Sequence, residues 1–325
     1  MQITPSNSLV SALFSKNIAD LRARGQIVAQ EAVTGQYADL TKQLGGGVGK
    51  AMLAQKAVDD ISAHRAQLDL RAGRLAVTQI SLGKIHEGVE GLDVRMISAL
   101  GMGDVTGRNL AARDAGIALQ DTFAALNVRH VDRYLFSGEA TATPPFGDPA
   151  GLLADIRAIA SSAPDAAAFE AAIDAYFHAE DGPWQTAIYR GTANAPDGES
   201  VTATDPAITE LISGLAILAL SGSDEDLPLL RQSPALVESA AARLSSGRTA
   251  LTALRSEVGV HEDRIARSRE ALDTEEVVLK TVFGSLAGRD QYEAASELKQ
   301  IEASLEASYL LTARLANLSL LNFLR

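Results

Sequence analysis

The sequence predicts a mainly α-helical protein in which long helices from both chain ends form an antiparallel coiled-coil rod, with a small inserted α+β domain. The first observation is that every proline except Pro5 lies between Pro144 and Pro234. A proline inside a helix costs about 3 kcal/mol, so long helices fit only the two proline-free blocks. The second observation is that both blocks carry apolar residues at intervals of seven. We therefore expect helical halves at residues 1–137 and 233–325 around an inserted domain at 138–232.

The first helix is expected at residues 8–33, with one apolar face and with Thr34 and Gly35 as its end. The connection that follows ends in a glycine-rich run at residues 45–49, which predicts a flexible or tightly turned segment. A phosphate-binding loop is not expected, because that pattern needs a glycine at Leu44 and a serine or threonine at Ala51.

Two further helices are expected at residues 51–100 and 107–136, separated by the glycines at 101 and 103. The seam of the second helix consists of apolar residues spaced by seven: Ile61, Leu68, Leu75, Leu82, Val89 and Met96. In the inserted domain, helices are expected near residues 152–160 and 166–177, and strands at 184–189 and 200–204.

The second flank begins at Ser233, a good N-cap, followed by Pro234 at the first helical position. Its seam has eight apolar residues spaced by seven: Val237, Leu244, Leu251, Val258, Ile265, Leu272, Leu279 and Leu286. A helix of about fifty residues is about 75 Å long, whereas a compact chain of this size is only about 50 Å across. The sequence therefore predicts a rod of paired helices.

The last helix is expected from Asp290 to the chain end, because Asp290 and Glu293 have the spacing of a helix start. Apolar residues continue along this helix and surround most of it near the end. We expect them to be covered by the first helix and by neighbouring copies of the chain, and residues up to about 33 and beyond about 290 to order only then. The predicted assembly interface comprises Val10, Phe14, Ile18, Leu21, Leu298, Ile301, Leu305, Tyr309, Leu315, Leu318, Leu321 and Phe323.

Composition excludes several classes of function. The net charge of −12 would repel a phosphate backbone, so nucleic acid is not an expected partner. The absence of cysteine excludes disulfides and thiol chemistry, and the five histidines never have the i, i+4 spacing of a helical metal pair. No Gly-x-Ser-x-Gly elbow and no apolar run long enough for a membrane span occurs. We therefore expect no enzyme activity, cofactor, metal or membrane partner.

Three places in the sequence resemble the flagellin and hook-associated group of bacterial flagellar axial proteins. The first is the closing helix, with LEASY at 305–309, TARL at 312–315 and LSLLNFL at 318–324. The second is DQYEAA at 290–295, which resembles the start of that helix. The third is RYLFSG at 133–138 with TPPF at 143–146, supported by YRG at 189–191. This third place resembles the hook–filament junction members of the group more than the filament subunit.

The resemblance implies a non-enzymatic structural subunit at the hook–filament junction of the extracellular flagellum. It implies export through the flagellar type III channel without a cleaved signal peptide. The implied partners are further copies of the chain in a ring, hook-associated protein 1, flagellin and an export chaperone. A filament-forming flagellin remains an alternative of the same class. A cytoplasmic coiled-coil adaptor is an alternative of another class, but its seams would have to continue through the nine prolines after Pro5.

Overall fold

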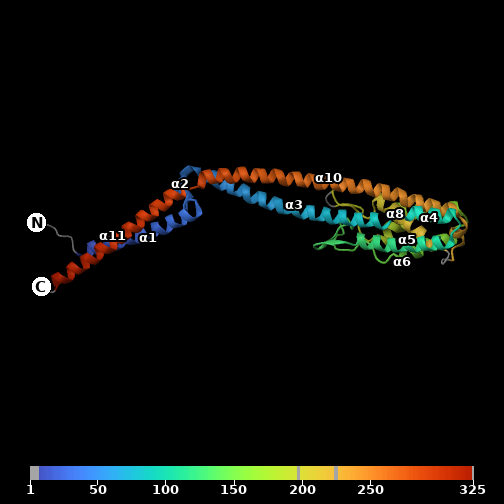
Figure 1. Cartoon of the computed structure of the whole chain (residues 1–325), viewed down its shortest axis with the longest axis horizontal. Coiled ribbons are helices and arrows are strands. Elements are labelled where there is room, and N and C mark those ends of the chain that lie inside the picture. Colours follow the sequence, from blue (N-terminus) through green and yellow to red (C-terminus); the bar gives the residue numbers. More distant parts are fainter. Residues whose placement is uncertain (1–6, 196–197, 223–225, 324–325) are drawn as a thin grey trace. The chain divides into compact units, whose positions relative to one another are not determined.

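The computed structural model describes residues 7–195, 198–222 and 226–323, with side chains between residues 12 and 314. The described residues are mainly α-helical (Figure 1), which confirms the predicted fold class at this level. The chain separates into two compact units. Unit 1 consists of Met1–Arg65 and Glu270–Arg325, and unit 2 of Ala66–Arg269. The predicted boundaries at residues 137 and 232 stay a prediction.

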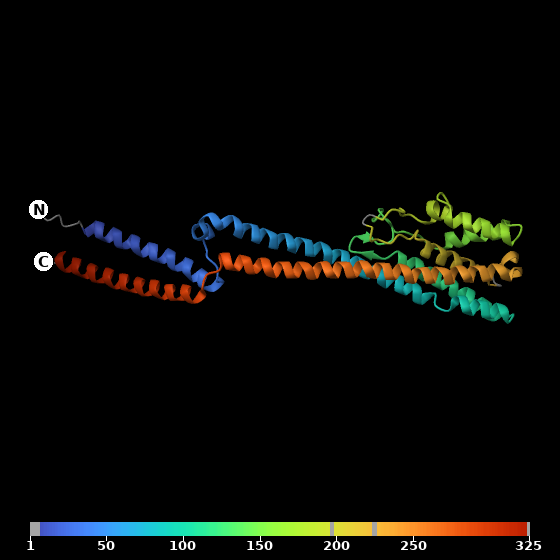
Figure 2. The same cartoon turned by 90° about the horizontal axis from the view of Figure 1, so that it is seen from above.

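Unit 1 is built on two antiparallel helices, α1 (Asn7–Thr34) and α11 (Gln291–Phe323), which lie side by side in both views (Figures 1 and 2). The connection after α1 contains the short helix α2 (Leu40–Leu44) and one 3-10 turn, η1 (Gly45–Gly47). Unit 1 also contains the beginning of α3 (Val48–Gly88) and the end of α10 (Pro234–Ala287).

The ends of the two paired helices follow the predicted signals. Helix α1 ends at Thr34, and Gly35 has φ 67°, a left-handed conformation that glycine adopts without strain. The Gly35 N–H donates to the Glu31 carbonyl at 2.8 Å. Before α11, the Asp290 carboxylate accepts from the N–H groups of Tyr292 at 2.8 Å and Glu293 at 3.3 Å. Both predicted helix boundaries are therefore confirmed.

Unit 2 is a helical bundle with a small hairpin. Its hairpin strands β1 (Arg129–His130) and β2 (Arg133–Tyr134) are antiparallel, with Arg129 opposite Tyr134. The remaining elements, besides the rest of α3 and α10, are α4 (Leu92–Gly101), α5 (Val105–Leu126), α6 (Ala150–Ser162), α7 (Ala166–His178), the π-helical turn η2 (Trp184–Ile188), α8 (Pro206–Leu220) and α9 (Pro228–Gln232).

Helix α8 forms the centre of unit 2, since nearly all of its residues are buried. Two glycines let α8 and α10 approach closely. A Cβ added at Gly214 would lie 2.7 Å from the Leu244 nitrogen, and one added at Gly247 would lie 2.6 Å from the Leu211 nitrogen. Any side chain at these two positions would therefore push the helices apart.

The predicted seams lie on buried faces. All six seam residues of the first flank, from Ile61 to Met96, are buried. On α10 the seam is buried from Val237 to Ile265 and half-buried from Leu272 onward. In unit 2, the Gln79 amide donates to the Arg255 carbonyl at 3.0 Å and so joins α3 to α10. The helix start at Pro234 is also confirmed.

Four predicted elements are wrong. The helix expected at 51–100 is interrupted between Gly88 and Leu92, where Gly91 has φ 70° and begins a new helix. The helix expected at 107–136 ends at Leu126 and is followed by the β1–β2 hairpin. The strands expected at 184–189 and 200–204 do not form: the first is the π-helical turn η2, and the second is a loop. The helices expected near 152–160 and 166–177 are confirmed as α6 and α7.

Candidate assembly interface

The inner contact between α1 and α11 has a small buried core. Val28, Ala294 and Ile301 are 3%, 0% and 6% exposed. Gly25 faces Ile301 so closely that an added Cβ would lie 3.3 Å from the Ile301 Cγ2 atom. Gly25 has no side chain and Ala294 has a small one, so the two helices can pack tightly there. Partly buried apolar side chains extend this core: Leu21, Ala32, Leu298 and Leu305.

The structure places four of the predicted interface residues in this inner contact. Leu21, Leu298, Ile301 and Leu305 join α1 to α11 within one chain. Tyr309 also contributes, because its hydroxyl accepts from Arg22 Nε at 2.7 Å and the Arg22 guanidinium lies over its ring.

Seven predicted interface residues remain. Phe14 and Ile18 are half-buried. The side chains of five further residues lie outside the part of the chain that the structure describes: Val10, Leu315, Leu318, Leu321 and Phe323. The assembly role of all twelve residues stays a prediction.

A second group of apolar side chains lies on the outer faces of the same helices. We call Leu13, Ile27, Leu310 and Leu311 the outer set; they are 66%, 48%, 60% and 50% exposed. Sequence reasoning missed these residues because they fall outside the stripe that faces the partner helix. The signal was present, however, since Leu310 and Leu311 directly follow Tyr309 and widen the apolar face there.

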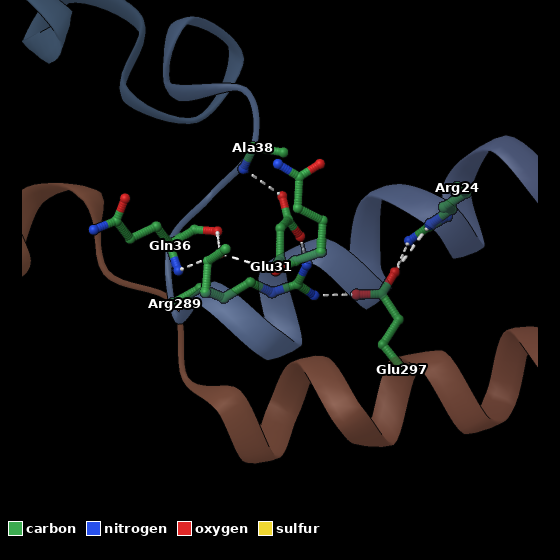
Figure 3. A network of polar contacts seen from close by, with 8 residues as sticks. Arg24, Glu31, Gln36, Ala38, Arg289 and Glu297 are labelled. Atoms are coloured by element: carbon green, nitrogen blue, oxygen red, sulfur yellow. Dashed lines mark hydrogen bonds and ion pairs between the residues drawn. The ribbon is translucent and has the colours of Figure 1, made fainter.

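The two chain segments that enter the helix pair meet at a joint, defined here as residues 34–38 and 287–291 (Figure 3). Gln36 and Gly288 form an isolated antiparallel bridge. The Tyr37 N–H donates to the Ala287 carbonyl at 3.0 Å, and the Arg289 N–H donates to the Gly35 carbonyl at 2.9 Å. The joint therefore ties the end of α1 to the beginning of α11 by backbone hydrogen bonds.

Charged side chains reinforce the joint. The Arg289 guanidinium binds the carboxylates of both Glu31 on α1 and Glu297 on α11, and Glu297 also pairs with Arg24 at 2.6 Å (Figure 3). Glu31 accepts in addition from the Ala38 N–H at 2.9 Å. The Arg289 and Glu31 side chains are only 10% and 7% exposed, so this pair is shielded from water. Burial would raise the pKa of Glu297, but its hydrogen bonds from Arg24 and Arg289 outweigh burial and lower it.

The motif segments at 133–146 and 189–191 meet in unit 2. Gly138 has φ 61°, and an added Cβ would lie 2.1 Å from the Thr192 carbonyl oxygen. The Tyr189 hydroxyl donates to the carbonyls of Phe136 at 3.0 Å and Thr192 at 2.9 Å. The Arg190 N–H donates to the Pro145 carbonyl at 2.9 Å. These segments therefore lock together two parts of the chain that are about fifty residues apart.

An aromatic cluster anchors the same region to α5. The Phe146 ring lies 4.6 Å from Phe123, 5.2 Å from Trp184 and 5.8 Å from Tyr189 between centroids. Asn127 at the end of α5 binds both backbone groups of Phe146 at 3.0 Å. Burial raises the pKa of Tyr189, so its hydroxyl stays protonated and can donate at physiological pH. The motif residues thus have structural roles.

Comparison with known proteins finds a match for one member of the helix pair. Residues 242–324, which include most of α10 and all of α11, match the family model of the bacterial flagellin C-terminal helical region. The match covers about a quarter of the chain and identifies that part as a flagellin C-terminal helical region. It supports a structural component of the flagellum of the flagellin and hook-associated type. A search of curated proteins gave no match.

Among solved structures, this chain is similar to one provisionally described as a flagellar hook-associated protein from Vibrio parahaemolyticus. The two chains are 10% identical, with a TM-score of 0.40, and the likeness covers 83% of this chain and 96% of the other.

The described residues contain no cluster of three or more histidines and carboxylates that could hold a metal ion. No helix within the described ranges is long and apolar enough to cross a membrane. A pocket in unit 2, lined by Arg71, Arg133 and Glu199 among others, has room for about one water molecule. Arg71 binds Glu199 at the edge of this pocket. The candidate functional site is therefore the exposed apolar surface of the helix pair in unit 1.

Proposed function

We propose that the chain is a hook–filament junction subunit, similar to hook-associated protein 3, and that it assembles through the outer faces of α1 and α11. The observation that carries the proposal is the outer set, four exposed apolar side chains on a helix pair whose C-terminal member matches the flagellin model. Exposed apolar groups on a structural subunit are suited to burial against neighbouring subunits. The resemblance at 133–138 and 143–146 favours the junction position over the filament.

Burial of the outer set would supply favourable free energy for assembly. Fully burying a leucine or isoleucine contributes about 1.5–3 kcal/mol, and these four side chains still expose 48–66% of their area. Each would therefore add about 1 kcal/mol when a neighbouring copy covers it. The predicted residues near the chain end, Leu315, Leu318, Leu321 and Phe323, would extend this surface. Ordering of the terminal helices would then accompany assembly.

The proposed partners follow from a position at the hook–filament junction. Copies of the chain would form a ring, with hook-associated protein 1 on one side and flagellin on the other. An export chaperone would cover the terminal helices before the chain passes through the flagellar type III channel. The parts of the chain proposed to carry these roles are the helical halves at 1–137 and 233–325, with the insert at 138–232 between them.

Complementation in a strain that lacks the gene tests the assembly role. Leu310→Ser with Leu311→Ser changes two exposed residues, so the isolated protein should keep its helical content while motility and the protein in sheared flagella are lost. Lys299→Ser, an exposed change on the same helix, is the matched control and should retain both. Removal of residues 318–325 should likewise leave a folded protein that does not join the flagellum. Normal filaments with the double variant would contradict the proposal.

The alternatives predict different behaviour. A flagellin would polymerise into long filaments when purified protein is added to filament seeds, whereas a junction subunit would not. A cytoplasmic coiled-coil adaptor would remain in the cytosol and would be missing from sheared flagella. Labelling the protein in intact flagella would separate the first two, because a junction subunit would give one spot at the hook end and a flagellin would label the whole filament.

A further inference from the structure

We infer that the tip of the β1–β2 hairpin, Val131 and Asp132, binds the outer face of α5 in a second copy of the chain. Both surfaces lie in unit 2, so the contact does not involve α1 or α11. The contact requires only that copies lie next to one another. It therefore applies to a junction subunit and to a filament subunit alike, and it adds a second assembly surface to the one proposed for the terminal helices.

Val131 has a backbone conformation that its residue type disfavours. Among the described residues it is the one non-glycine residue with a positive φ, 58°. The hairpin pairs His130 with Arg133, so Val131 and Asp132 form a two-residue loop. A hairpin loop with positive φ at its first position alone normally has glycine there, and a β-branched side chain makes that conformation strained. Local structure therefore gives no reason for a valine at this position.

The Val131 side chain contributes little to the packing of its own chain, because it is 76% exposed. Its neighbours hold the hairpin in place. The hairpin lies against α3 at Gly73, where an added Cβ would be 2.9 Å from the His130 Nε2 atom, and the Arg129 guanidinium donates to the Asp132 carbonyl at 3.2 Å. Strain that is retained at an exposed apolar residue indicates that the side chain is needed for a contact with a partner.

The outer face of α5 provides a surface of matching chemistry. Leu110 and Ile117 lie two turns apart on this face and are 61% and 57% exposed. Arg113 lies one turn before Ile117 and Asp121 one turn after it, and both are exposed. The face therefore consists of apolar side chains between a positive end and a negative end.

The hairpin tip carries groups of the same kinds. Arg129 and Asp132, both exposed, precede and follow Val131. With Val131 against Ile117 of a second copy, Arg129 would face Asp121, and the acidic end of the tip would face the positive end of the α5 face. Opposite charges at both ends would fix the direction of docking, and burial of the apolar side chains would supply favourable free energy.

The tip cannot reach the α5 face of its own chain. Helix α5 ends at Leu126, and the hairpin begins at Arg129 and lies beyond that end (Figure 1). Ile117 lies about 14 Å along the helix from its end, and Leu110 about 24 Å. Because the two surfaces differ, each copy can bind one neighbour with its tip and another with its α5 face. Contacts of this heterologous kind generate rings or helical filaments.

Disulfide trapping tests the contact, because the chain has no cysteine. The full chain with Val131→Cys and Ile117→Cys carries one cysteine on each surface, so oxidation should give a ladder of dimers, trimers and longer species. Val131→Cys with Val260→Cys is the matched control, since Val260 is 56% exposed on α10, and it should give no ladder. Neither cysteine alone should give a disulfide-linked dimer.

The ladder is measured in flagella sheared from complemented cells and in concentrated purified protein. Its absence from both preparations would overturn the inference. A dimer formed by Val131→Cys alone would do so as well, because it would show that tips meet tips. A ladder in the purified protein, with the chain missing from sheared flagella, would contradict the proposed junction role and would support the contact.

Charge reversal tests the direction of docking. In the chain with cysteines at positions 131 and 117, Arg129→Glu should lower the yield of the ladder by about fivefold, and Asp121→Arg added to it should restore the yield. No fall with the first change, or no recovery with the second, would overturn the pairing of these two residues.

Val131→Gly tests the origin of the strain. Glycine adopts a positive φ without strain, so the unfolding temperature should stay unchanged or rise. A lower unfolding temperature would show that the valine stabilises its own hairpin, and the inference would then lose its basis.

Discussion

Replacing Ile301 by alanine should weaken the α1–α11 pair. The side chain is 6% exposed and lies at the centre of the inner contact. The change removes roughly three methyl or methylene groups, worth about 0.8 kcal/mol each, and leaves a cavity beside Gly25. Because solvent can reach the edges of a two-helix contact, we expect about 3 kcal/mol, near the lower end of the range for buried isoleucine.

The matched change on the outer face is Leu311→Ala. Leu311 is 50% exposed, so its truncation loses about half of the burial that a core leucine would lose. Alanine is also a slightly better helix former, which offsets part of the loss. We expect a loss of less than about 1 kcal/mol from the contacts within one chain. The two variants thus separate residues that hold the chain together from residues proposed to join one chain to another.

Hydrogen exchange of the α1 amides is the assay. Ile301→Ala should accelerate exchange in α1 by about a hundredfold, which corresponds to the expected loss of about 3 kcal/mol, while amides in α8 of unit 2 exchange as before. Leu311→Ala should change α1 exchange by less than about fivefold. Equal effects of the two substitutions, or unchanged α1 protection in Ile301→Ala, would refute the assignment of an inner and an outer face.

Three further predictions concern other parts of the molecule. Gly214→Ala places a Cβ against the backbone of α10 and should lower the stability of unit 2 by about 1–3 kcal/mol in thermal unfolding, whereas Gly259→Ala, which meets nothing within 4 Å, should be neutral or stabilising. Tyr189→Phe removes the donor of two hydrogen bonds at the motif segments and should cost about 1–3 kcal/mol in denaturant unfolding. Hydrogen bonds from two arginines outweigh burial and hold the pKa of Glu297 below its ordinary 4.5, so its stabilisation is present above pH 4.5 and is lost below it. Protection of α1 should fall in that acid range, and Glu297→Gln should flatten the dependence.

Much of the helical architecture follows from local signals in the sequence. The heptad seams predicted buried faces on α3 and α10, because an apolar stripe at that spacing has to be covered. Gly35 and Asp290 marked helix ends correctly, since a left-handed glycine and a capping carboxylate act within a few residues. These features depend on neighbours in the sequence, so the sequence alone suffices to predict them.

The predictions were wrong where contacts between distant parts of the chain determine the local structure. The break before α4 was missed because Val89 and Met96 are buried on either side of it and continue the heptad spacing. Residues 184–189 alternate in a way that suits a strand, but a strand needs a partner, and the buried Trp184 ring packs against Phe146 and Phe177 instead. Turns that depend on such contacts leave little trace in a local pattern.

The interface was predicted only in part, for a related reason. Periodicity identifies the most apolar stripe of a helix, and the chain uses part of that stripe, including Leu298 and Ile301, for its own helix pair. Whether a stripe is covered from within or by another chain depends on the distant segment that reaches it. Leu310 and Leu311 became evident as an outer face only when α1 was seen to occupy the opposite side.

The two long helix pairs are stabilised differently, and this difference bears on assembly. Helices α3 and α10 carry buried large side chains along most of their seams, together with ion pairs such as Arg65 with Asp273 in unit 1 and Asp69 with Arg269 in unit 2. Among the described side chains, the buried cluster between α1 and α11 contains three residues and lies toward the joint. Helices in water owe most of their stability to tertiary packing, so the part of this pair beyond Leu305 has little to hold it in a single chain. Neighbouring copies that cover the outer set would supply that packing, and the free energy that orders the terminal helices would then come from assembly itself.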